Sequence, residues 1–136
     1  GSYYWIPEER NKSFEANKKA ISLAELQLKI NPKDEFILSQ LATYYGMINE
    51  KLKTIFYLKE LEKLELKDVT TIFRIGVTYE QWLNDRGNAL KWIEKAISKG
   101  YPVKEVYQLP GLKNLINDKR FTDFNKSFQF DNKMKL

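Results

Sequence analysis

The chain has 136 residues, of which 43% are apolar and 14% aromatic, enough for one folded domain and too apolar for a disordered chain. It contains neither Cys nor His, which excludes disulfides, zinc clusters, thiol nucleophiles and imidazole bases. Its net charge of +5 is concentrated towards the two ends, mostly in the last forty residues or so.

The start of the chain carries no recognisable targeting segment. Residues 1–2 are Gly-Ser, which resembles the remnant left when a purification tag is removed. We therefore expect the native chain to begin further upstream. No apolar run approaches the length of about 18 residues that a membrane span needs. A cytoplasmic location is expected on this basis.

The first half of the chain predicts three helices. Residues 12–30 have apolar side chains at three- and four-residue steps, and Asn31-Pro32 ends that pattern. Residues 3–11 are left as a separate segment, because Pro7 is unfavourable inside a helix. Asp34 is expected to cap a second helix that runs to about Met47. A third helix is predicted over 50–66, with these side chains facing inward: Leu52, Ile55, Phe56, Leu58, Leu61 and Leu64.

The second half predicts two long helices and a different tail. Asp68 is expected to cap a helix that runs to about Leu83, and residues 84–87 read as a turn. The next helix carries Ala89, Trp92, Ile93, Ala96 and Ile97 on its buried face and ends at Gly100. Residues 103–130 predict two or three short helices that cover the preceding helices, and residues 131–136 are expected to be disordered. No sustained alternation predicts a strand.

The two halves are related by a period of thirty-four residues. Leu38 is followed at that distance by Ile72, Leu41 by Ile75, Ala42 by Gly76 and Tyr45 by Tyr79. Small residues at such offsets let two helices approach closely, and this period is typical of helix–turn–helix repeats. These residues resemble the tetratricopeptide repeat family, with repeats at 35–68 and 69–102 and a partial one at 12–34. On this resemblance, residues 3–11 are expected to be the remnant of a first repeat. Residues 109–115 and 118–121 look like the C-terminal repeat module of multidomain bacterial signalling proteins.

The resemblance implies an all-α array of antiparallel helix hairpins, an α-α superhelix closed by a short helical C-terminal cap. It also implies a protein–protein interaction or scaffold module of a larger regulatory protein. In the family the first helix of each repeat lines a concave groove that binds a peptide or a partner surface. The groove places fall here on Phe36, Ser39, Gln40, Thr43, Met47, Thr70, Phe73, Arg74, Val77, Glu80 and Gln81.

Other functions remain open at this stage. Lys and aromatic residues interleave in the tail, which would suit nucleic acid or an acidic partner. The aromatic cluster Tyr3, Tyr4 and Trp5 could form an exposed patch. The chain would then be a monomer, or a weak homodimer that associates through this patch, and its role could be that of a structural or dimerisation spacer. Catalysis is not expected: no Gly-rich phosphate loop exists, and the densest carboxylates alternate with Lys as on a solvated helix face. We expect no catalytic residue, cofactor or metal.

Overall fold

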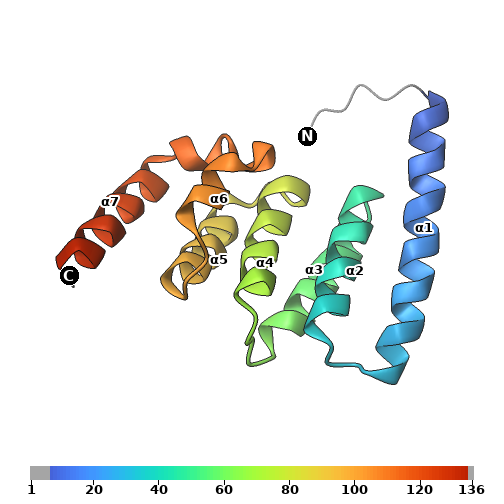
Figure 1. Ribbon diagram of the computed structural model, residues 1–136. Coiled ribbons are helices and arrows are strands. Elements are labelled where there is room, and N and C mark those ends of the chain that lie inside the picture. The colour runs from blue at the N-terminus through green and yellow to red at the C-terminus, as the bar shows by residue number, and fades with distance from the viewer. Residues whose placement is uncertain (1–6, 135–136) are drawn as a thin grey trace. The chain divides into compact units, whose positions relative to one another are not determined.

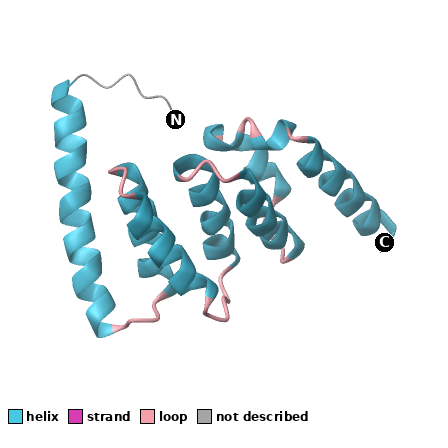
Figure 2. Cartoon of the chain, turned by 180° about the vertical axis from the view of Figure 1, so that it is seen from behind, coloured by secondary structure: helices cyan, strands magenta, loops and turns pink. Residues whose placement is uncertain are grey.

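The computed structural model describes residues 7–134 of the chain, and their side chains from Ser13 onward. Within this range the structure is helical, with loops between the helices and no strand (Figures 1 and 2). The helices are α1 (Pro7–Ile30), α2 (Glu35–Met47), α3 (Lys51–Glu62), α4 (Val69–Trp82), α5 (Arg86–Ser98), α6 (Val103–Gln108) and α7 (Lys119–Met134), with short 3-10 turns η1 (Pro110–Leu112) and η2 (Leu115–Asn117) before α7. The prediction of an all-α fold is confirmed for these residues.

The chain divides into two compact units, and the boundary along the sequence lies between Lys67 and Asp68. The first unit contains α1, α2 and α3, and α2 packs against both of the others. Helix α1 begins at Pro7, earlier than predicted. Proline is favourable there because the first turn of a helix needs no N–H donor. Residues 7–11 thus belong to α1 and are not a separate segment.

Local signals fix where α2 begins. The Asp34 carboxylate accepts a hydrogen bond from the backbone N–H of Ile37 (3.1 Å), which satisfies one of the free donors of the first turn. The core of this unit then joins Ile21 and Ala24 of α1 to Ile37, Leu41 and Tyr45 of α2.

Helix α3 buries only part of the predicted face: Leu58 and Leu61 are buried as expected, but near the start of the helix the buried residue is Thr54. Its buried side chains are Thr54, Leu58 and Leu61, at steps of four and three residues. The Thr54 hydroxyl donates to the backbone carbonyl of Ala42 (2.9 Å), so a polar residue occupies the core side. Consequently the side chains predicted to face inward near the start of α3 are exposed: Leu52 by 83%, Ile55 by 38% and Phe56 by 55%. The helix also ends at Glu62, four residues before the predicted end.

The second unit is built on a hairpin of α4 and α5, which pack closely along their length (Figure 1). The two helices approach closely at Gly76, where a Cβ atom would lie 2.6 Å from Cγ1 of Ile93. Asp68 caps α4 as expected. Asp85 caps α5, which therefore begins at Arg86 within the predicted turn. Gly100 follows α5 with a φ of 112°, the conformation that favours glycine at a helix end.

The tail folds onto this hairpin. Helix α7 packs against α5, and η1 packs against α4. The fully buried side chains of the tail, from α6 to α7, are Val106, Leu112, Leu115 and Phe121. Helix α7 is longer than the short helices predicted. It continues to Met134, so residues 131–134 are helical where disorder was expected.

Candidate functional site

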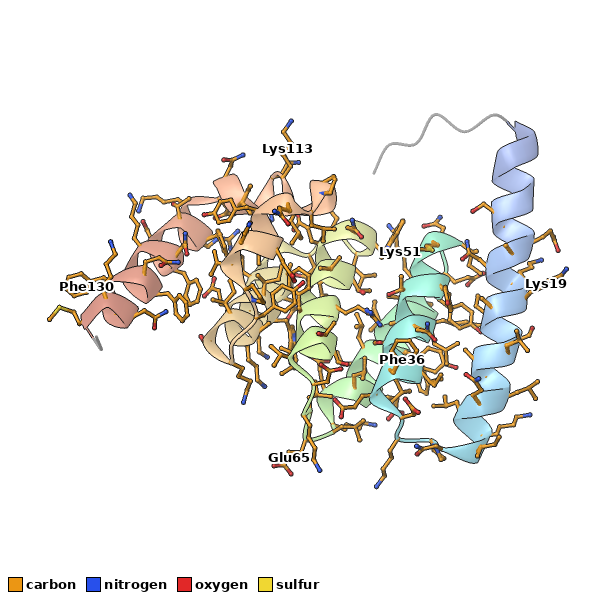
Figure 3. All side chains as sticks on the ribbon, viewed as in Figure 1. Lys19, Phe36, Lys51, Glu65, Lys113 and Phe130 are labelled. Atoms are coloured by element: carbon orange, nitrogen blue, oxygen red, sulfur yellow. The ribbon has the colours of Figure 1, made fainter. Side chains whose placement is uncertain are left out.

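Four of the five predicted groove residues of α2 lie on one face of the helix. Phe36, Gln40, Thr43 and Met47 are spaced by four, three and four residues, which puts them on one face. We call these four residues the α2 stripe. Phe36 is 52% exposed and Met47 is 46% exposed, while Gln40 and Thr43 between them are half-buried (Figure 3 labels Phe36). The stripe therefore presents an apolar side chain at each end and polar groups in the middle.

The same spacing recurs on α4. Thr70, Arg74, Val77 and Gln81 occupy the places thirty-four residues after the α2 stripe, and we call them the α4 stripe. Thr70 is exposed and the other three are half-buried. The Gln81 side chain lies close against Gly111 of η1, leaving no room for a Cβ atom there. The α4 stripe is thus more polar and more enclosed than the α2 stripe.

Two of the predicted groove residues are buried, and a third is held in an ion pair within the fold. Ser39 is 2% exposed, and its hydroxyl donates to the carbonyl of Phe36 (2.8 Å). Phe73 is 7% exposed, because its ring stacks on that of Tyr101 with centroids 4.0 Å apart and planes 12° apart. Glu80 holds Arg86. Ser39 and Phe73 are therefore not presented to a partner, although the resemblance placed both in the groove.

Glu80 belongs to an ion network of the second unit. The Arg86 guanidinium donates through Nε (2.8 Å) and Nη2 (2.7 Å) to the two carboxylate oxygens of Glu80 and through Nη1 to Asp118 (3.2 Å). The hydrogen bonds that Arg86 donates to Glu80 raise the pKa of Arg86. Hydrogen bonds from Arg120, then from Arg86, hold the pKa of the Asp118 carboxyl well below its usual range. This network joins α4 and α5 to the start of α7. Its role in holding these helices together accounts for the shifted pKa values.

The aromatic residues of α7 mostly contact one another or the core. Phe121 is fully buried, Phe124 and Phe128 stack at 5.8 Å between centroids, and Tyr107 meets Phe121 edge-on at 6.0 Å. Two of the neighbouring cations are paired, Lys119 with Asp123 (2.8 Å) and Arg120 with Asp118 (2.9 Å). A stacking platform needs exposed rings beside available cations. Phe121 is therefore unsuited to stacking on a base, whereas Phe130 is 63% exposed and lies between the exposed Lys126 and Lys133 in the sequence.

The first unit also contains side-chain contacts and a cleft that were not predicted from the sequence. The Tyr45 hydroxyl donates to Glu25 of α1, and its ring stacks on Tyr57 of α3 at 5.7 Å. Burial, then the bond to Glu25, raises the pKa of Tyr45. An open cleft of about 440 Å³ lies nearby. It is lined by Leu28, Pro32, Lys33, Leu38, Phe56, Tyr57, Glu60, Lys63 and Leu64. Tyr45 follows the repeat period, but no pattern in the sequence indicates its contacts with Glu25 and Tyr57 or the cleft.

The predicted patch of Tyr3, Tyr4 and Trp5 lies outside the described residues. Of the other two tryptophans, Trp92 is 4% exposed and belongs to the core, while Trp82 is half-buried.

Family models, curated proteins and solved structures were compared with the chain. None matches it. The resemblance to tetratricopeptide repeats therefore depends on the spacing of residues in this chain. Among the described residues no group of three or more acidic side chains could hold a metal ion. Across the same residues, no helix combines the length and the apolar character needed to traverse a bilayer.

Proposed function

We propose that the chain is a protein-interaction module of the tetratricopeptide type, part of a larger bacterial regulatory or signalling protein. It binds a peptide or a partner surface through the first helix of each hairpin, without catalysis. The observation that carries this proposal is the α2 stripe, in which Phe36 and Met47 remain exposed at the two ends of one helix face. Recurrence of the same spacing on α4 supports it, since both hairpins then offer the equivalent face.

The α2 stripe has the composition of a small binding surface. Phe36 and Met47 are separated by eleven residues, about 16 Å along a helix. An aromatic side chain buries roughly 150–250 Å² when it is fully covered. The exposed half of Phe36 thus offers about 100 Å², which is worth about 2.5 kcal/mol at ~25 cal/mol per Å². Gln40 and Thr43 lie between the two apolar side chains, where polar groups fix the register of a bound chain.

A random peptide library displayed on phage tests the proposal. Peptides are selected on the wild-type protein, synthesised, and measured by fluorescence anisotropy against two variants. The first variant is Phe36→Ala with Met47→Ala. The matched control is Leu52→Ala, since Leu52 is an even more exposed apolar residue on α3. We expect the stripe variant to bind at least roughly tenfold more weakly and the control to bind as the wild type does.

Equal binding to both variants would contradict the role of the α2 stripe. Failure to enrich any peptide would favour a structural spacer instead of a binding module.

A further inference from the structure

Helix α1 has an apolar ridge on the side that faces away from α2. Leu23 is 64% exposed, Leu26 is 58% exposed and Ile30 is 87% exposed. The opposite side of the same helix carries Ile21 and Ala24, which are buried against α2. Figure 3 shows side chains projecting from α1 away from α2, with Lys19 labelled among them. Large apolar side chains gathered on one exposed helix face mark an interaction surface.

The spacing of this ridge is that of a helix–helix seam. Leu23, Leu26 and Ile30 are separated by three and four residues, and the same alternation extends back to Lys19 and Ala16. We call these five residues the α1 outer seam. A three–four alternation keeps a narrow line of side chains on one side of a helix, where another helix can pack along it. Beside the seam lies a shallow, mostly apolar hollow of about 410 Å³, lined by Lys18, Lys19, Ser22 and Leu23.

The exposed charges around the seam are mostly basic. From Glu15 to the end of α1 the exposed charged side chains are Lys18, Lys19 and Lys29, with Glu15 as the one acidic group among them. The other carboxylate in that stretch, Glu25, accepts the hydrogen bond from Tyr45 on the α2 side. A partner that covers the seam therefore needs acidic groups beside its own apolar ridge, since like charges brought together oppose association.

We propose that the α1 outer seam docks an amphipathic helix of a partner protein, with an apolar ridge flanked by Glu or Asp. A second copy of α1 fits poorly, because it would bring three exposed lysines and only one exposed carboxylate, Glu15, to a seam that is already mostly basic. A lipid surface also fits poorly. Helices that lie on membranes present a broad apolar face, whereas Ser22 and Gln27 are exposed beside this narrow seam. This surface is distinct from the α2 stripe and does not depend on the function proposed for it.

Two designed helical peptides of about 21 residues test this inference. Both carry the same leucine ridge at three–four spacing, and they differ only in flanking residues, Glu in one and Lys in the other. Binding to the full chain is measured by fluorescence anisotropy. The seam variant is Leu23→Ser with Ile30→Ser, and the matched control is Leu52→Ser on α3. A charge variant, Lys19→Glu with Lys29→Glu, leaves the apolar ridge intact. Vesicles of phosphatidylserine and phosphatidylcholine form a separate arm.

We expect the acidic peptide to bind at least roughly tenfold more tightly than the basic one. The seam variant should lose roughly tenfold or more in affinity, the control should lose nothing, and the charge variant should reverse the preference between peptides. The inference is overturned if the acidic peptide fails to bind at about 1 mM, if the peptides bind equally well, or if the seam variant binds normally. Binding to phosphatidylserine vesicles that needs Leu23 and Ile30, without peptide binding, would assign the surface to lipid instead.

Discussion

Replacement of Gly76 by alanine tests the packing of the second hairpin directly. The added Cβ would lie 2.6 Å from Cγ1 of Ile93, 3.0 Å from its backbone N and 3.1 Å from the carbonyl oxygen of Ala89. Non-bonded carbon contacts are most favourable at about 3.5–4.0 Å. Two of these three neighbours are backbone atoms of α5, which no rotamer change can move, and Ile93 is fully buried.

The net effect combines a loss and a gain. Overpacking of a well-filled core costs about 1–3 kcal/mol, and this site falls at the upper end because the helix itself must shift. Alanine recovers about 1 kcal/mol of helix propensity relative to glycine. We therefore expect Gly76→Ala to lower the free energy of unfolding of the second unit by about 2 kcal/mol. At a urea dependence of about 1 kcal/mol per M, the midpoint falls by about 2 M.

Urea denaturation followed by tryptophan fluorescence measures this change. A Trp5→Phe background leaves Trp82 and Trp92, which both lie in the second unit. Gly87→Ala is the matched control, because its nearest neighbour, the Asp85 carboxylate, is 3.8 Å from the added Cβ. That variant should gain up to about 1 kcal/mol of stability from helix propensity alone. A Gly76→Ala protein as stable as the wild type would refute the close approach of α4 and α5.

Two predictions concern pH. The pKa of Asp118 is lowered in the folded chain, so its ionised form favours folding above the unfolded pKa of about 4, and this contribution is lost as the pH falls through the folded pKa. Asp118→Asn should therefore be less stable than the wild type at pH 7, with the gap between their urea midpoints narrowing below about pH 4; a gap that is constant with pH would contradict the ion network. Burial, then the bond to Glu105, raises the pKa of Tyr101 to about 12. Its neutral phenol favours folding up to the unfolded pKa of about 10, and that contribution disappears as the pH rises towards the folded value. Ultraviolet difference titration of the wild type against Tyr101→Phe should isolate one ionisation near the raised value, and an ionisation near pH 10 would argue against the enclosed stack on Phe73.

Much of the fold could be predicted because its signals are local. Aspartates before apolar runs indicate helix starts, and Asp34 and Asp68 do cap α2 and α4. The buried face at the start of α3 could not be predicted in the same way, although Leu58 and Leu61 further along are buried as predicted. A count of apolar residues favours Leu52 and Phe56, whereas the structure buries Thr54, whose hydroxyl finds an acceptor on another helix. Only the packed structure shows that acceptor.

The candidate site was predictable to the extent that it follows helical spacing. The α2 and α4 stripes lie on the first helices of the hairpins and keep the expected period. Phe73 and Glu80 depart from the prediction because their partners come from elsewhere in the chain. Tyr101 follows the hairpin and covers Phe73, while Arg86, at the start of α5, takes both oxygens of Glu80. Repeat spacing identifies a helix face but does not show which neighbour will cover it.

The two hairpins achieve their close contact by different means, and this limits how freely their parts can be exchanged. In the first, a threonine hydroxyl from α3 reaches the Ala42 carbonyl. In the second, Gly76 admits Ile93 and the backbone of α5 at a distance that a methyl group would block. A chimera that joins α2 to α5 would put the Ala42 methyl where only hydrogen fits. Each second helix is thus matched to its own first helix, and the natural unit for grafting or recombination is the intact pair.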